Sequence, residues 1–222
     1  MLVFLVCLTG CPLAPLGNYH TPEPLGEGNL RVGVAGTAAP IFTMDALSEF
    51  RGTFVTGGGD VWIDHGFKKN RDLRYRLTFI PAGDLRDGPD WANFLAGMSF
   101  EYKSSNKSGS AAYLTGFSAL LLVDTDIPEN LFPLFSPFFG AIFGVGDPGG
   151  IRLLLTPRMN VALVPLVGLQ AGFSVGLDLP VGRTFTLRPE AGINFGLLTV
   201  LGDDTDEWVL PIWGGFGLAM IF

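Results

Sequence analysis

Residues 159–177 constrain the fold more than any other stretch, because none of these nineteen positions is charged. Hydropathy alone would predict a membrane-spanning helix of that length. Apolar residues, however, occupy every odd position from Val167 to Leu179, while the even positions hold Gly, Gln, Ser and Asp. A two-residue period is typical of a β-strand, whose side chains alternate between two faces. We therefore predict a strand with one apolar and one polar face, and not a helix.

The same alternation recurs along the chain and yields ten strand candidates. Clear versions cover 73–81, 92–103, 151–163 and 184–197, and weaker ones cover 29–38, 52–65, 109–123, 135–146 and 207–222. The polar face is mostly Gly, Ser, Thr and Asn, with arginines and acids, whereas the outer face of a soluble sandwich tends to be rich in Lys and Glu. Only 16% of the residues are charged and 48% are hydrophobic, which excludes a disordered chain.

A strand pattern with an apolar outside and a small polar inside indicates a membrane barrel. Every backbone N–H and C=O must be paired within the protein in lipid, so a sheet that crosses the bilayer must close on itself. We predict an all-β fold for 29–222: a transmembrane antiparallel up-and-down β-barrel of about ten strands, with eight as the alternative. A soluble secreted β-sandwich is the rival fold.

The N-terminus has the features of an export signal. Met1 to Leu8 is apolar, and the sequence Leu8-Thr9-Gly10-Cys11 that ends this stretch resembles the bacterial lipobox, although the n-region has no Lys or Arg. The resemblance implies a signal peptide over 1–10, cleavage before Cys11 and lipidation of its thiol. Four prolines between residues 12 and 27 predict an extended tether after the anchor, so that 11–28 would be lipidated Cys and tether.

The C-terminus resembles the final-strand signal of bacterial outer-membrane barrels. In that signal a terminal aromatic residue follows apolar residues at every second position, and here the series is Phe216, Leu218, Met220 and Phe222. The match is partial, because Gly215 stands at a polar slot. The resemblance implies a bacterial outer-membrane location. It also implies that outer-membrane lipids, lipopolysaccharide and the barrel assembly machinery are the partners.

The connections between the strands indicate the topology. The longer set is 39–51, 83–90, 124–134 and 200–206, as expected of external loops, and most of the acids in the connections lie in it. The shorter set is 66–69, 104–108, 147–150 and 180–183, as expected of periplasmic turns. An even strand number then places both termini in the periplasm. Val164-Pro165-Leu166 must form a tight outer connection, and without that hairpin the barrel has eight strands.

Few residues suggest specific chemistry. The predicted lumen charge network is Arg74, Arg76, Glu101, Arg152, Arg158, Asp178, Arg188 and Glu190. Opposite charges can neutralise one another in a narrow interior; an anion-conducting lining is the alternative. Trp62, Trp91, Trp208 and Trp213, with Tyr75 and Tyr102, are candidates for the aromatic girdles.

Two further acidic groups have weak functional signals. The oxygen ligands of Asp203, Asp204, Asp206 and Glu207 suit Ca²⁺. This run lacks the spacing of an EF-hand, so we favour a solvated loop and predict no metal site or cofactor. Asp64 and His65 are adjacent on a strand and should point to opposite faces, which disfavours a catalytic pair.

The functional prediction is correspondingly broad. A net charge of −7 disfavours a nucleic-acid partner. We expect a non-enzymatic outer-membrane barrel lipoprotein with a structural or interaction role, acidic external loops and a narrow lumen filled by side chains. A pore or transporter for a small solute is the first alternative, and an outer-membrane hydrolase of lipid or peptide is the second.

Overall fold

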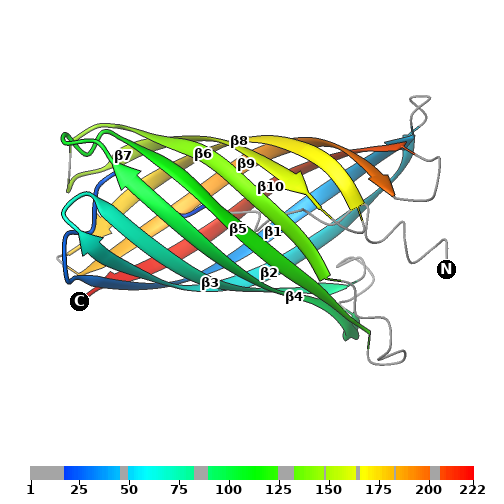
Figure 1. The fold of residues 1–222 in the computed structure, drawn as a ribbon, viewed down its shortest axis with the longest axis horizontal. Coiled ribbons are helices and arrows are strands. Elements are labelled where there is room, and N and C mark those ends of the chain that lie inside the picture. The colour runs from blue at the N-terminus through cyan, green and yellow to red at the C-terminus, as the bar shows by residue number, and fades with distance from the viewer. Residues whose placement is uncertain are drawn as a thin grey trace.

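The protein folds as a closed barrel of ten antiparallel strands (Figure 1). The computed structural model describes residues 18–45, 50–82, 90–124, 133–147, 149–163, 166–182, 184–200 and 206–222. The strands are β1 (Leu30–Asp45), β2 (Phe50–Lys68), β3 (Arg71–Ala82), β4 (Asp90–Ser105), β5 (Ala111–Asp124), β6 (Pro133–Val145), β7 (Arg152–Ala162), β8 (Leu166–Val181), β9 (Phe185–Val200) and β10 (Asp206–Ile221). The predicted ten-stranded barrel is confirmed, and the eight-stranded alternative is wrong.

Each strand pairs with its neighbours in sequence, and β1 pairs with β10 to close the sheet. The backbone of Leu30 exchanges hydrogen bonds with that of Phe222 at the seam. The shortest strand, β7, has 11 residues and the longest, β2, has 19, whereas a tilted strand crosses a bilayer in about 9–11 residues. Every strand is therefore long enough to span. No helix in the described part of the chain is long and apolar enough to cross a membrane.

Side chains alternate between the outside and the lumen as the sequence predicts. On β3, Tyr75, Leu77 and Phe79 are exposed, and the residues between them, Arg76 and Thr78, are buried. The same parity holds on β4, β7, β8 and β9. Aromatic rings also pack side by side on the outer wall, as in the Tyr75–Phe100 pair at 5.4 Å. The apolar residues therefore coat the barrel, and the polar residues face inward.

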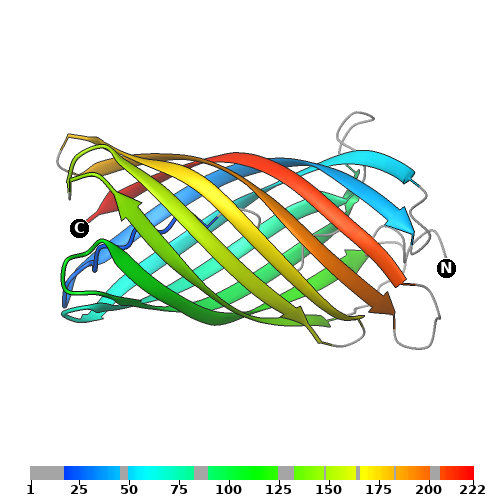
Figure 2. The ribbon, with the colours of Figure 1, turned by 90° about the horizontal axis from the view of Figure 1, so that it is seen from above.

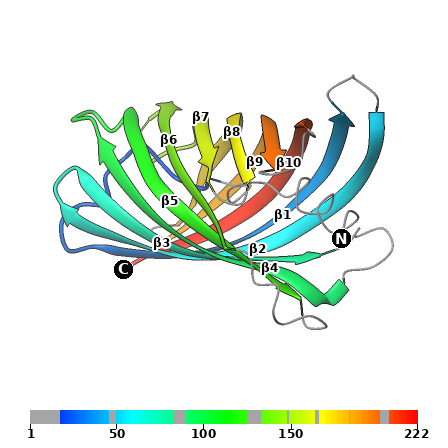
Figure 3. The same cartoon turned by 45° about the vertical axis from the view of Figure 1, so that its right-hand side comes forward.

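Short turns gather at the end of the barrel where Phe222 lies, here named the short-turn end (Figure 2). Gly149 and Gly182 have φ of +79° and +72° in two of these turns, a conformation that glycine adopts without a steric penalty. Figure 3 shows the tilted strands as one continuous wall. The hairpin formed by β7 and β8 is confirmed, because these strands pair up to Ala162 and Gly168, while Val164 and Pro165 between them lie outside the described residues. The long connection expected at 39–51 is wrong in extent, because β1 stays paired with β10 up to Asp45.

A charge on the outer wall should destabilise the barrel in a membrane. Leu77 lies midway along β3 and is 64% exposed. We expect Leu77→Arg to lower the free energy of unfolding by about 2–4 kcal/mol, because the guanidinium would enter hydrocarbon. Urea titration in lipid vesicles measures the change, with Leu77→Val as the apolar control. Equal stability of the two variants would contradict a lipid-facing wall.

Candidate functional site

The lumen is lined by buried charged side chains. Seven cationic residues face it: Arg31, Arg74, Arg76, Lys103, Arg152, Arg158 and Arg188. Five buried carboxylates, Asp60, Asp64, Asp72, Glu101 and Glu190, and the partly buried Asp178 oppose them. The interior of the described barrel thus holds nearly balanced charge, as a desolvated network requires.

Most of these charges form close ion pairs across neighbouring strands. Asp64 on β2 accepts hydrogen bonds from Arg31 on β1 at 2.7 Å and from Arg74 on β3 at 2.5 Å. The other pairs are Arg76–Glu101 at 3.2 Å, Lys103–Asp72 at 2.7 Å and Arg188–Asp178 at 2.7 Å. These pairs connect adjacent strands and fix the inner surface of the wall.

The structure places all eight residues of the predicted network on the lumen side of their strands. Sequence reasoning left out Arg31, Asp60, Asp64, Asp72 and Lys103, which belong to the same network. Their positions follow the same two-residue period, so extending the parity along β1 to β4 would have found them. Arg158 differs from the rest, because no described carboxylate pairs with it. Its guanidinium lies 3.8 Å from the Phe138 ring centre and donates to Asn160 at 2.9 Å.

The stretch of chain before β1 lies inside the barrel. Residues 18–25, here called the N-terminal segment, run through the lumen towards the short-turn end (Figures 1 and 2). The sequence indicated only an extended tether here. Asn18, Tyr19, His20 and Thr21 are all at most 4% exposed. The polar side chains of the segment are compatible with a polar lumen, but the two-residue period of the strands does not predict that the segment lies there.

Asn18 connects opposite sides of the wall. Its carbonyl oxygen accepts hydrogen bonds from Arg74 at 2.8 Å and from Arg76 at 2.9 Å, both on β3. Its side-chain amide donates to Ser174 on β8 at 3.0 Å and accepts from Arg158 on β7 at 3.0 Å. The side-chain amide also lies 3.3 Å from Glu190 on β9, so that one residue reaches four separate strands across the lumen.

Tyr19 fills a pocket of its own. Its ring stacks on Trp62 of β2, with 5.6 Å between centroids and 3° between planes. Its hydroxyl donates to the carbonyl oxygen of Gly36 at 3.4 Å and lies 2.9 Å from the Thr37 hydroxyl. Burial raises the pKa of the phenol, so the hydroxyl stays protonated and able to donate. The φ of Tyr19 is +48°, a conformation that costs an L-residue about 1–2 kcal/mol.

His20 contacts the wall at β4. Its Nε2 lies 2.5 Å from Oε2 of Glu101 on β4, and its Nδ1 has no described hydrogen-bond partner. Burial, together with the nearby Arg74 guanidinium, lowers the pKa of His20 to about 3, although Glu101 acts in the opposite direction. The imidazole is therefore neutral and donates its Nε2 proton to Glu101.

Residues 21–25 of the segment are bound near the short-turn end. Lys103 donates to the carbonyl oxygens of Thr21 at 3.0 Å and Glu23 at 2.6 Å. Asp72 accepts from the backbone N–H of Leu25 at 3.1 Å. Glu23 also pairs with Arg152. The segment thus contacts eight strands, β1 to β4 and β7 to β10.

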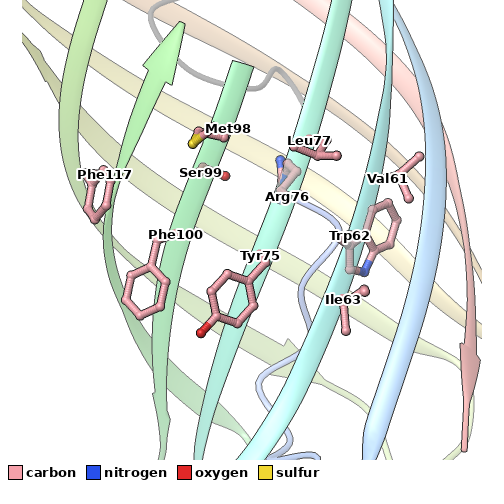
Figure 4. Close-up of a pocket in the computed structure, with 10 residues that line it drawn as sticks. All are labelled: Val61, Trp62, Ile63, Tyr75, Arg76, Leu77, Met98, Ser99, Phe100 and Phe117. Carbon is pink, nitrogen blue, oxygen red and sulfur yellow. The ribbon is translucent and has the colours of Figure 1, made fainter. Parts of the chain in front are cut away.

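The outer wall has a separate apolar groove of about 700 Å³ over β2 to β5. Figure 4 shows Val61, Ile63, Tyr75 and Leu77 along this groove. These side chains are exposed, so the groove faces outward and matches the acyl chains of lipid. It is distinct from the polar lumen behind the wall.

Other predicted residues lie apart from this site. Trp62 is not in an aromatic girdle. The even-numbered residues of β2 from Asp60 to Asp64 face the lumen, and the Trp62 side chain is 1% exposed there. Asp64 is buried and His65 is exposed, so the adjacent acid and imidazole do not meet. Asp206 and Glu207 belong to β10, while Asp203, Asp204 and the lipidation candidate Cys11 lie outside the described residues. No group of metal-ligating side chains occurs in the described chain.

The residues of the C-terminal signal complete β10. Phe216 and Leu218 point outward at 49% and 37% exposure, and Met220 is half-buried. Phe222 follows the last strand residue and is exposed at the short-turn end. The alternation of this signal therefore matches the outward face of the last strand.

One serine, one acid and one histidine lie together in the described lumen, but not in the order of a catalytic triad. Ser99, Glu101 and His20 lie together, but the Ser99 hydroxyl donates to Glu101 at 3.0 Å. His20 contacts the other oxygen of the same carboxylate. The Ser99 hydroxyl and the His20 imidazole therefore both take the Glu101 carboxylate as their partner, which differs from a Ser-His-acid triad, where the imidazole lies between the hydroxyl and the acid.

Comparison with known proteins adds only a general likeness. No protein-family model matches the chain, and no curated protein sequence matches it. The structure is similar to the outer membrane protease OmpT of Escherichia coli, with 7% identity, a TM-score of 0.47 and coverage of 87% of this chain and 97% of that one. Neisserial surface protein A has 13% identity and a TM-score of 0.34, with coverage of 84% of this chain and 95% of that one. The Yersinia pestis protein Ail has 8% identity and a TM-score of 0.29, with coverage of 88% of this chain and 99% of that one. Such values carry no argument about activity, and the fold rests on the strand pairing above.

Removal of the shared carboxylate should destabilise the network strongly. Asp64→Asn leaves both Arg31 and Arg74 without a carboxylate, and breaking a buried ion pair in this way costs about 3–5 kcal/mol. Asp178→Asn is the matched control, because Asp178 pairs with one arginine and is 16% exposed. Urea unfolding in vesicles should give the larger loss for Asp64→Asn, and equal losses would contradict a network centred on Asp64.

Docking of the N-terminal segment should weaken at acidic pH. An undocked imidazole has a pKa of 6.5 and the docked one a pKa of about 3. Below about pH 6.5 the undocked segment therefore binds a proton that the docked segment does not, and docking weakens by up to tenfold per pH unit. Hydrogen-exchange protection of residues 18–25 measures this. The His20→Gln variant should lose this part of the pH dependence, and identical profiles would contradict the assignment.

Proposed function

We propose that the chain is an outer-membrane barrel protein whose lumen is closed by its own N-terminal segment, and that its role is structural or interactive. The observation that carries this proposal is the contact of residues 18–25 with eight strands. A lumen that is occupied by the segment favours a barrel that does not conduct over the alternative of a permanently open pore. The outer wall, with its exposed apolar side chains, would contact the lipids and lipopolysaccharide of that membrane.

The lipid anchor remains part of this proposal. The lipobox-like sequence before Cys11 supports acylation of its thiol, with the barrel assembled by the barrel assembly machinery and Phe222, at the short-turn end, in the periplasm. Seven peptide units separate Cys11 from Asn18 and extend to at most about 25 Å. An acyl group on Cys11 would therefore stay close to the barrel. Palmitate labelling of the wild type against Cys11→Ala tests this part, and an unlabelled wild type would remove it.

Conductance tests the closed lumen. We expect wild-type protein in a planar bilayer to show no steady single-channel steps. The full-length variant Asn18→Gly/Tyr19→Gly/His20→Gly, here called the open-lumen variant, should conduct, because it lacks the side chains that hold the segment.

Glu27→Gly is the matched control, since Glu27 precedes the same strand but is exposed. This control should remain closed like the wild type. Steady single-channel steps from the wild type would contradict the proposal that the segment closes the lumen. Silence from a folded open-lumen variant would show that the wall side chains fill the lumen without the segment.

A further inference from the structure

Tyr19 is bound by the barrel on every side, as a small-molecule ligand would be. Its backbone N–H donates to Oε2 of Glu190 at 2.7 Å. Its carbonyl oxygen accepts from Arg188 at 2.7 Å and from Arg74 at 3.3 Å. An acid therefore faces its amino side, and two guanidinium groups face its carboxyl side.

The wall also leaves room for the aromatic ring of Tyr19. A Cβ at Gly217 would lie 2.8 Å from the ring, and its three nearest atoms would all belong to Tyr19. A Cβ at Gly215 would overlap the Tyr19 hydroxyl oxygen, and one at Gly33 would overlap the Trp62 ring on which Tyr19 stacks. Three glycines on β1 and β10 thus form a cradle with the dimensions of a phenol stacked on an indole.

We propose that this cradle, here called the Tyr19 pocket, is a binding site for a free tyrosine-type amino acid, and that Tyr19 is its built-in occupant. The ammonium group of the ligand binds Glu190 in place of the Tyr19 N–H. Its carboxylate binds Arg188 and Arg74 in place of the carbonyl, as charge-assisted hydrogen bonds that are stronger than those to a neutral peptide. Its phenol stacks on Trp62 and reaches Gly36 and Thr37.

The backbone conformation favours a free ligand over the tethered residue. Tyr19 occupies the pocket with a φ of +48°, which is a strained value for a residue with a side chain. A free amino acid has no preceding peptide bond and therefore no φ to strain. It also has a full charge at each end, where the peptide has only a dipole.

The tether sets the competition between the two occupants. A short flexible link gives the attached Tyr19 an effective concentration on the order of millimolar. A free ligand must therefore compete in the wild type, and it binds directly where the segment is displaced. The inference goes beyond the closed-barrel function: wild-type conductance tests closure, whereas ligand binding tests the pocket.

Calorimetric titration with L-tyrosine tests the Tyr19 pocket in full-length protein. We expect the open-lumen variant to bind L-tyrosine at least tenfold more tightly than the wild type does. Tyramine, which lacks the carboxylate, and L-phenylalanine, which lacks the phenol, should each bind the variant at least tenfold more weakly than L-tyrosine. Equal binding of all three compounds, or no binding of L-tyrosine, overturns the proposal.

A filled pocket is the matched control. Gly217→Val added to the open-lumen variant projects a side chain into the space that the Tyr19 ring fills and should reduce L-tyrosine binding at least tenfold. Unchanged binding would overturn the proposal. Heat-modifiable migration on a gel reports whether both variants fold.

If the open-lumen variant does not fold, hydrogen exchange of the wild type gives a second measurement. Millimolar L-tyrosine should then lower the protection of residues 18–25, whereas L-alanine should not. Equal protection with the two amino acids overturns the proposal.

Discussion

Closure of the sheet is the constraint on which the rest of the structure depends. A strand edge left open in hydrocarbon would leave backbone N–H and C=O groups unpaired, at several kcal/mol each. The pairing of β1 with β10 removes that edge. Once the sheet is closed, alternate side chains must face lipid and lumen. The apolar residues are then outside by necessity, and every charge in the middle of a strand must be accommodated within the barrel.

The lumen accommodates those charges in two ways. Opposite charges on neighbouring strands neutralise one another in ion pairs, as Asp64 does with Arg31 and Arg74. Other guanidinium N–H groups, those of Arg74, Arg76, Arg158 and Arg188, donate to uncharged oxygens of Asn18 and Tyr19 in the N-terminal segment. Arg158 depends most on this second way, because its described acceptors are the amide oxygens of Asn18 and Asn160. The segment therefore supplies acceptors to four arginines of the inner wall.

The sequence predicts the wall far better than its contents. The two-residue period gave the strand number, the facing of Leu77 and Arg76, and the lumen side of the charge network, because alternation is a local property of a strand. Trp62 was misplaced because a rule of residue type, tryptophan at the interface, was preferred over its parity. The docking of Tyr19 depends on three glycines and a tryptophan that lie far apart in sequence, and only the register of β1, β2 and β10 brings them together.

The chemistry of the segment also determines how firmly the lumen is closed. Water entering an open lumen can satisfy the same arginine donors, so each exchanged hydrogen bond contributes only about 0.5–1.5 kcal/mol net. Opposing these gains are the entropy of ordering residues 18–25 and the strained φ of Tyr19. Water cannot replace the stacking of Tyr19 on Trp62, which buries apolar surface. The closed state is therefore decided less by the many polar contacts than by one aromatic ring, and displacement of that ring is the step by which the lumen would open.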